Sequence, residues 1–317
     1  MDRPHLDSAI VSELHLAVPR RNWSRLIEFI LIYAISACAL YQIIIRSTGG
    51  VWIYLACIPL YLLAAASLHG ISLFTHEAVH GTLSQNRALN RALGIACAIP
   101  VLQNFAAYKV LHLRHHHLLG LPGDPDDYDN YTNWTWLVLA MHWGRLIAGY
   151  PAYITAIPIL GWRHGKAAER FWIAFEVLLI AIAIIAILIS PAPRLFLLHA
   201  WLIPMLFINT LVNIRGMSQH TLLENQSDTI QGTRSILTNR VTAYFMCNEN
   251  YHLEHHLYPG VPWYNLPRLH QALRTQLIDR GAPFINSYFA FVWQFITLPF
   301  SRPARGPSPT PQNPRPQ

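Results

Sequence analysis

The stretch Leu26-Ile-Glu-Phe-Ile-Leu-Ile-Tyr-Ala-Ile-Ser-Ala-Cys-Ala-Leu-Tyr-Gln-Ile-Ile-Ile45 decides the fold class, because it contains a single charged residue. As an α-helix it would be about 30 Å long, which matches the hydrocarbon core of a bilayer. Three further apolar stretches have similar lengths: 51 to about 73, 171–190 and 195–213. The sequence therefore predicts an all-α integral membrane protein with four transmembrane helices.

The composition agrees with this prediction. Hydrophobic residues make up 53% of the chain and charged residues only 12%, about half of the charged fraction that soluble domains carry. The 10 Trp and 14 Tyr residues suit the aromatic belts at membrane interfaces. A soluble globular protein is therefore excluded.

Short turns pair the four spans into two hairpins. Residues 46–50 join the first two spans, and residues 191–193 join the last two. We expect one membrane domain over residues 26–300, preceded by a cytoplasmic N-terminal segment (1–25) and followed by a disordered tail (301–317) that is rich in Pro, Arg, Ser and Gln.

Two apolar stretches between the hairpins are poor candidates for spans. Residues 93–107 are interrupted by Pro100 and are short, so we expect a re-entrant or interfacial helix. Residues 134–160 are rich in aromatic side chains and are interrupted by polar residues, so we expect an amphipathic segment at the membrane surface.

Basic residues predict the orientation. Arg20, Arg21 and Arg25 precede the first hairpin, residues 163–170 carry three basic side chains before the second, and Arg215 follows it. The positive-inside rule therefore places both termini in the cytoplasm. The net charge of +7 suits anionic lipid. No groove or recognition helix for nucleic acid is readable in the sequence, so we expect no nucleic-acid partner.

The 17 histidines outnumber the 16 acidic residues, and many of them lie in three clusters. The clusters are His76-Glu-Ala-Val-His80, His112-Leu-Arg-His115-His116-His117 and His252-Leu-Glu-His255-His256. Side chains three or four residues apart share one face of a helix. All three clusters fall in segments assigned to the cytoplasmic side. We therefore expect them to converge in a cytoplasmic helical cap that holds a metal site.

The number of imidazoles indicates two metal ions. Eight of them are too many for one tetrahedral zinc ion, and His220 follows the fourth span as a plausible ninth ligand. Imidazole binds Zn, Cu, Fe and Ni alike, so the ligand type does not choose the metal.

Two other functions must be weighed. His76-Glu77-x-x-His80 matches the zinc-protease motif, with Glu77 as general base. A protease would leave six clustered histidines unexplained. A metal transporter would carry ligands within its spans, and the clear spans are nearly free of them.

The order HxxxH, HxxHH, HxxHH around four spans resembles the membrane fatty acid desaturase superfamily, over about residues 55–269. The most specific matches are residues 76–81, 112–126 and 252–267. The resemblance implies two iron ions and dioxygen as co-substrate. It implies that the ligands are His76, His80, His112, His115, His116, His252, His255 and His256, with His220 as the family's additional histidine. If the second cluster is read as HxxxHH, His117 takes the place of one of its neighbours as a metal ligand.

The resemblance implies desaturation of a fatty acyl chain or a related amphiphile in a bacterial inner membrane. Hydroxylation or ketolation of a lipid, a carotenoid or a specialised small metabolite is the alternative. No His-Pro-Gly-Gly motif of a fused haem domain is present, so we expect a separate electron donor, a ferredoxin or a similar carrier. Gln219 stands where many relatives have an acidic residue.

Carboxylates near the clusters are candidates to orient the imidazoles, because a metal-bound histidine usually donates its other N–H to such a group. Glu77, Glu254 and the pair Asp126–Asp127 are the main candidates, and Glu249 is a weaker one. The Trp263-Tyr264 pair packs beside the site or lies at the membrane surface, and of the two we expect the membrane surface.

Overall fold

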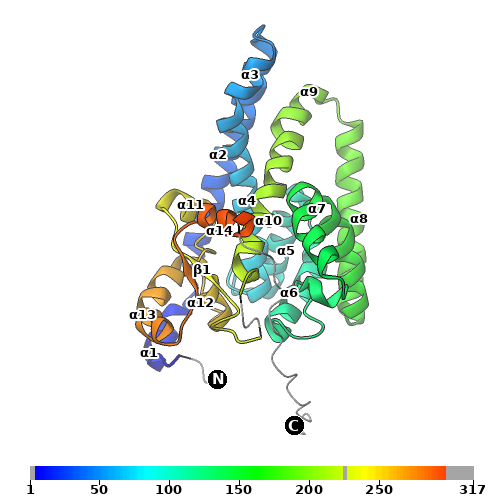
Figure 1. Ribbon diagram of the computed structural model, residues 1–317. Helices are drawn as coiled ribbons and strands as arrows, with labels where there is room; N and C mark the ends of the chain where they lie inside the picture. Colours follow the sequence, from blue (N-terminus) through cyan, green and yellow to red (C-terminus); the bar gives the residue numbers. More distant parts are fainter. Residues whose placement is uncertain (1–3, 224–226, 298–317) are drawn as a thin grey trace.

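Helices make up almost all the regular structure of the protein (Figure 1). The computed structural model describes residues 4–223 and 227–297. Within these residues, the single strand pairing joins β1 (Ser235–Ile236) to β2 (Phe284–Ile285) in parallel. The all-α prediction is therefore confirmed. The predicted disordered tail, 301–317, lies outside the described residues.

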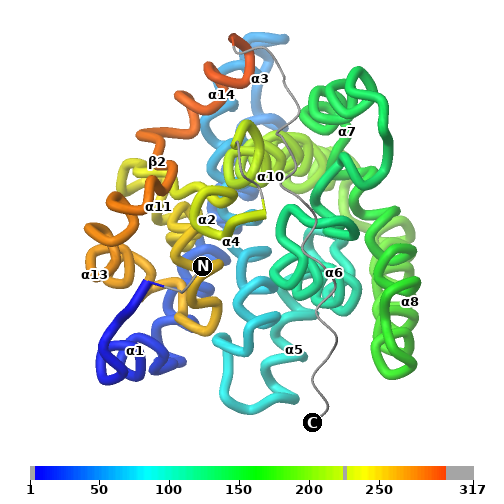
Figure 2. Tube along the Cα trace, turned by 60° about the horizontal axis from the view of Figure 1, so that its bottom comes forward, coloured from blue at the N-terminus to red at the C-terminus, as the bar shows by residue number. Residues whose placement is uncertain are grey.

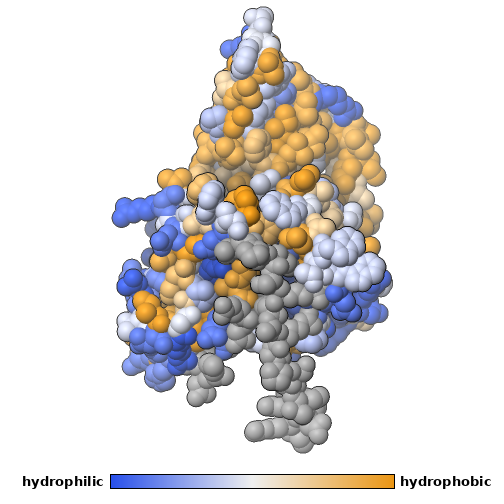
Figure 3. All heavy atoms as spheres, viewed as in Figure 1, coloured by the Kyte–Doolittle hydropathy of each residue, from blue (hydrophilic) through white to orange (hydrophobic). Residues whose placement is uncertain are grey.

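Within residues 4–223 and 227–297, four helical segments are long and apolar enough to cross a membrane: α2 (Pro19–Arg46), α4 (Ile58–His80), α8 (Ala167–Ile189) and the continuous segment Arg194–His220. Figure 3 shows the apolar surface gathered around the upper part of the molecule and polar surface below it. Ile182 and Ile189 on α8 are 52% and 79% exposed. Such exposure is unfavourable in water and favourable in lipid, so the protein is a membrane protein.

The second span differs from its prediction. It is divided at Cys57 into α3 (Val51–Ala56) and α4, and α4 continues past the predicted end at residue 73 to His80. Gly81 ends the helix in the left-handed conformation, with φ at +76°. The first histidine cluster therefore occupies the last turns of the span itself. The first span also begins earlier than expected, at Pro19.

The stretch expected to be re-entrant is a sharply bent pair of helices. α5 (Arg87–Ala98) continues into the short helix η1 (Ile99–Val101), and α6 (Phe105–Leu118) follows at 103°. The start of α6 is fixed by α8, because Glu176 accepts a hydrogen bond from the Ala106 N–H at 2.9 Å. This contact orients the helix that carries the second histidine cluster.

The predicted surface segment is one long helix, α7 (Thr135–His164), with a kink at Ala148. Pro151 explains the kink, because its ring removes a backbone hydrogen bond and clashes with the preceding turn. One face of α7 is exposed at Trp136 and Ile147, as expected. Its other face contacts α6 and α10 and lines a cavity, which the sequence did not predict.

The last span contains a π-helical turn. α9 (Arg194–Leu197), η3 (Leu198–Leu202) and α10 (Ile203–His220) follow one another without interruption. α4 and α10 lie at the centre of the molecule, whereas α8 lies at its edge and packs on α6 and α7 (Figures 1 and 2). The central pair therefore carries histidines at its lower ends.

The remaining helices surround the lower ends of α4 and α10. They are α1 (Ser8–Leu14), η2 (Tyr128–Asn130), α11 (Arg240–Phe245), α12 (His252–Leu257), η4 (Trp263–Asn265), α13 (Leu266–Asp279) and α14 (Tyr288–Thr297). α12 packs on α13 through the buried side chains of Leu253, Leu266 and Leu273.

Trp263 lies in the interior, so its expected location at the membrane surface is wrong. It is 5% exposed. Its indole N–H donates to Asn22 at 2.9 Å, and its backbone N–H donates to Glu77 at 3.3 Å. An indole with a hydrogen-bond partner is stable in a protein interior, and here it connects α2 to the helix of the first histidine cluster.

Candidate metal centre

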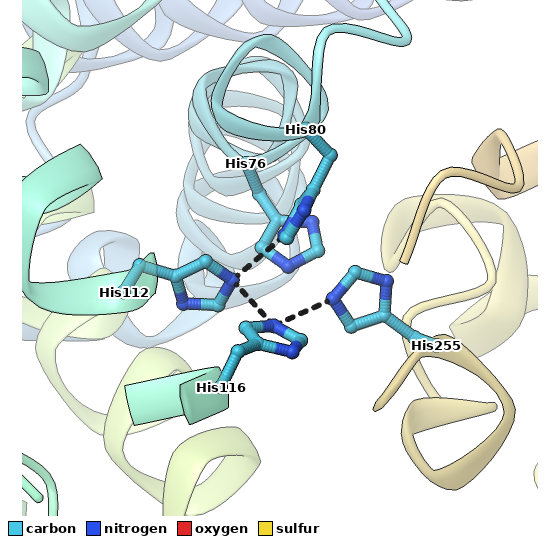
Figure 4. A group of neighbouring side chains, drawn as sticks. All are labelled: His76, His80, His112, His116 and His255. Carbon is cyan, nitrogen blue, oxygen red and sulfur yellow. Dashed lines mark hydrogen bonds between the residues drawn. The ribbon is translucent and has the colours of Figure 1, made fainter. Parts of the chain in front are cut away.

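Five histidines from three helices converge at one point (Figure 4). His76 and His80 come from α4, His112 and His116 from α6, and His255 from α12. Each histidine contributes one ring nitrogen, and these five nitrogens all lie within 4.8 Å of one another. We call these five residues the first histidine group.

The distances within the first histidine group fit a common metal ion. Nε2 of His112 lies 3.0 Å from Nε2 of His80 and 3.0 Å from Nε2 of His116. With a metal–nitrogen distance of about 2.1 Å, two ligands at right angles are separated by about 3 Å. The buried Nε2 of His76 has no hydrogen-bond partner. A buried polar atom without a partner destabilises the fold, and a bound cation would remove this penalty.

Four more histidines form a second histidine group beside the first: His115, His220, His252 and His256. Nε2 of His252 lies 3.1 Å from Nε2 of both His220 and His256. The two groups are in contact, because the rings of His116 and His256 stack with their centroids 4.2 Å apart. The nine predicted ligands are therefore all brought together, as two adjacent sets of nitrogen donors.

Helix geometry explains how one cluster supplies both groups. His112 and His116 are four residues apart and share one face of α6, whereas His115 points to the second group. In the same way, α12 sends His255 to the first group and His252 and His256 to the second. His117 is exposed and belongs to neither group.

Oxygen acceptors outside the groups hold the Nδ1 atoms, so that Nε2 points inward. Asp124 lies 2.8 Å from Nδ1 of His115, and the Gly232 carbonyl lies 3.0 Å from Nδ1 of His220. Glu249 has one oxygen 3.0 Å from Nδ1 of His76. That ring N–H is not aligned with the oxygen, so the contact is electrostatic. Such oxygen partners are typical of metal-bound histidine.

Glu249 touches both histidine groups. Its second oxygen lies 3.8 Å from Nδ1 of His252 and 3.8 Å from a terminal nitrogen of Arg215. The carboxylate is 1% exposed. A single buried anion is therefore shared by one ligand of each group and by one arginine.

The carboxylates that we ranked highest from the sequence contact the ligands less directly than Asp124 and Glu249 do, although Glu77 has an oxygen within 4.8 Å of a ring nitrogen of His76. Glu77 accepts a hydrogen bond from the Thr82 hydroxyl at 2.6 Å, and Glu254 lies 2.5 Å from Nδ1 of His270. Asp126 is 3.8 Å from His115, farther than Asp124. We missed Asp124 because the tight loop that returns it to His115 is not encoded by helix periodicity. The sequence feature that could have identified Asp124 as this acceptor is its place in the Gly-Asp-Pro-Asp run.

Burial keeps the histidines of α12 in their neutral form. Burial lowers the pKa of His252 to about 4 and holds the pKa of His255 and His256 well below the usual value. Neutral imidazole is the form that binds a metal ion. A set of neutral, converging nitrogens with oriented outer partners fits metal ions better than it fits a hydrogen-bonded core.

A cavity of about 650 Å³ opens onto the histidines. His76, His112, His115, His220 and His252 form part of its wall, and α7 and α10 form much of the remainder. One cavity therefore borders both histidine groups.

The fatty acid desaturase family model matches residues 50–288, which is well over half of the chain. The chain belongs to the fatty acid desaturase family. It is therefore an oxidoreductase of lipid metabolism in a membrane. Membership of the family favours this function over the protease and transporter alternatives. The matched region contains all nine histidines of the two groups.

Three curated relatives are desaturases. Dihydrorhizobitoxine desaturase from Bradyrhizobium elkanii is 27% identical over 73% of this chain and 69% of its own length. Sphingolipid delta(4)-desaturase/C4-monooxygenase DES2 from Homo sapiens is 25% identical over 88% of this chain and 81% of its own. The same enzyme from Bos taurus is 26% identical over 72% and 68%.

Proposed function

We propose that the protein binds two iron ions through its nine converging histidines and uses dioxygen to desaturate a fatty acyl chain or a related amphiphile. The observation that carries this proposal is the division of the nine imidazoles into two adjacent groups with shared access to one cavity. When bound, a di-iron centre supplies the oxidising power that removes hydrogen from an unactivated carbon.

The protein residues have three roles in this reaction. The imidazoles hold the metals, while Asp124, Glu249 and the Gly232 carbonyl fix the direction of the rings. The cavity wall positions the substrate against both groups and excludes bulk water. Reduction of dioxygen to two water molecules takes four electrons. Desaturation supplies two of them, so a separate donor, a ferredoxin or a similar carrier, must supply the other two.

The proposed orientation places the histidines and both termini in the cytoplasm of a bacterial cell, with the protein in the inner membrane. α3 and α9, at the turns between paired spans, lie at the end of the molecule opposite the histidine-bearing ends (Figure 1). Arg20, Arg21 and Arg25 precede the first pair of spans, which favours a cytoplasmic histidine side. In this arrangement α5, α6, α12 and α13 form the cytoplasmic cap.

Hydroxylation is the second candidate reaction. A relative with 25% identity is named both a desaturase and a C4-monooxygenase, so one scaffold accommodates both outcomes. Loss of a second hydrogen gives an alkene, whereas transfer of oxygen gives an alcohol.

Metal analysis and product mass test the proposal together. The purified protein is expected to contain two irons per chain. With a reduced ferredoxin and oxygen, lipids of the expression host are expected to lose two hydrogens; a gain of one oxygen would indicate hydroxylation. A matched preparation of the His116→Ala variant serves as control. One tightly bound zinc, or equal turnover by that variant, would contradict the di-iron proposal.

A further inference from the structure

Cations outnumber carboxylates where α5, the first half of α6, the end of α7 and the start of α8 meet. α6 contacts the other three helices. From here α8 runs to α9 at the opposite end of the molecule (Figure 1), so this region lies on the histidine side. The carboxylates of these segments are Glu169 and Glu176. We call their six cations the basic corner: Arg87, Arg91, Lys109, Arg163, Lys166 and Arg170.

Both carboxylates are engaged by backbone N–H groups. Glu169 accepts a hydrogen bond from the Lys166 N–H at 2.6 Å, and Glu176 accepts one from the Ala106 N–H at 2.9 Å. No carboxylate of the described residues lies within ion-pair distance of the basic corner. The arginines that form ion pairs there are Arg25, Arg215 and Arg268. The positive charge of the corner is therefore free to bind an anion from outside the chain.

Arg91 and Lys109 form the most enclosed part of the basic corner. The guanidinium carbon of Arg91 lies 4.4 Å from the centre of the Trp172 ring on α8, which is a favourable cation–π distance. Lys109 is half-buried on the neighbouring α6. Burial and then repulsion from Arg91 lower the pKa of the Lys109 ammonium, whereas Glu169 opposes this shift. An anion between the two cations would relieve the repulsion.

An exposed apolar stripe on α8 begins beside these cations. The rings of Phe171 and Trp172 are 5.6 Å apart, and aromatic side chains of this kind are typical of a membrane interface. Residues three and four positions apart share a helix face, and the stripe continues along α8 in this way. Its members are Phe171, Phe175, Leu178, Ile182 and Ile185. A soluble anion or an acidic protein would leave this stripe without a role, whereas a phospholipid matches both features.

We propose that Arg91 and Lys109 bind the phosphate of an anionic phospholipid from the leaflet on the histidine side, with its acyl tails along the apolar stripe of α8. Basic pockets between membrane helices bind such headgroups, and charge-assisted hydrogen bonds to phosphate are strong. A zwitterionic headgroup binds less well, because its own ammonium group is repelled by the two cations. The bound lipid would join α5, α6 and α8, and α6 carries three of the nine histidines.

The proposed lipid site is separate from the cavity at the histidines. Neither Arg91 nor Lys109 nor Trp172 belongs to the cavity wall. Lipid binding at the basic corner therefore needs no metal, oxygen or reductant. The proposal concerns a structural lipid at the outer surface of the helices and goes beyond the proposed oxidation.

Photoaffinity labelling tests the headgroup preference. The probes are phosphatidylglycerol and phosphatidylcholine with identical tails, each with a diazirine in one tail. They are added to the purified protein in nanodiscs of unlabelled phosphatidylcholine. We expect phosphatidylglycerol to label the α8 peptide 171–185 about tenfold more than phosphatidylcholine does, because the anionic headgroup gains charge-assisted hydrogen bonds. Equal labelling of this peptide by both probes would overturn the proposal.

Matched variants assign the preference to the two cations. The double variant Arg91→Gln, Lys109→Gln is expected to lose the roughly tenfold preference. The charge-conserving double variant Arg91→Lys, Lys109→Arg is expected to keep it, which separates loss of charge from loss of folding. Arg46→Gln, at the opposite end of α2, is the control and should behave like the unmodified protein. A neutral double variant with the full preference would refute the site.

Two further measurements distinguish the lipid from other anions. Inorganic phosphate, compared with chloride at equal ionic strength, is expected to leave the labelling by phosphatidylglycerol unchanged, because the tails contribute to binding. Selective displacement by phosphate would identify a free-phosphate site and contradict the lipid proposal. The neutral double variant is expected to bind reduced ferredoxin as the unmodified protein does. If it instead kept the lipid preference and lost ferredoxin binding, the basic corner would be a protein-docking surface and the proposal would be wrong.

Discussion

Nε2 of His255 lies 3.1 Å from Nε2 of His116, although 139 residues separate the two in the chain. His116 belongs to α6 and His255 to α12, so the first histidine group is complete only when the C-terminal part of the chain packs against the bent helix pair. Metal binding and the docking of α12 are therefore coupled, since a ligand that binds only the folded arrangement stabilises it.

Replacement of one inward histidine is expected to disable the site. His255→Ala removes a nitrogen donor from the first histidine group. Activity and metal affinity are expected to fall by on the order of 10²-fold or more, because loss of a residue that only hydrogen-bonds to a ligand already costs about 10–100-fold. His117→Ala is the matched control, because His117 is exposed and belongs to neither group. Metal content and turnover are measured on both; similar losses would contradict the assignment of ligands.

Asp124→Asn is expected to weaken metal binding by the second histidine group. The asparagine keeps a hydrogen-bond acceptor near His115 but removes the charge that makes the imidazole a better ligand, for a cost of about 10-fold to 100-fold in affinity. Asp126→Asn is the control, because Asp126 is 3.8 Å from His115 and its side chain is 61% exposed. Competition with a chelator measures both affinities. A larger effect at Asp126 would show that the acceptor has been misassigned.

Glu249→Gln is expected to weaken both metal positions together. Its carboxylate oxygens lie near His76 of the first histidine group and His252 of the second, and one substitution therefore affects a ligand of each. A loss of about 10-fold in affinity at each position is expected. Titration of metal-free protein with iron(II) distinguishes this from Asp124→Asn, which should affect one position. If Glu249→Gln weakened iron(II) binding at only one of the two positions, the shared role of this carboxylate would be contradicted.

Removal of metal is expected to loosen the ends of the helices that meet at the site. Without cations, the converging nitrogens of α4, α6 and α12 have few partners, and local opening becomes easier. Hydrogen exchange should therefore increase at residues 252–257 and 112–116 after chelation. α8 carries none of the nine histidines and is the internal control. Unchanged exchange at α12 would mean that its packing on α13 alone holds it in place.

The sequence determined the architecture because its signals are local. The length of apolar stretches such as 171–190 sets which helices can cross a membrane, and α8 occupies nearly the same residues. The four-residue spacing of His112 and His116 likewise fixed that these two rings share a face of α6. Those properties need no knowledge of any other part of the chain.

Tertiary structure decided how these local pieces combine. The division of nine histidines into groups of five and four depends on the relative directions of α4, α6, α10 and α12. The same packing selected Asp124 and Glu249 over Glu77 and Glu254 as partners of the ligands. It also brought Arg145 and Arg215 to one cavity. Spacing along a helix fixes the face of a side chain, but only the packing of distant helices fixes what that face meets.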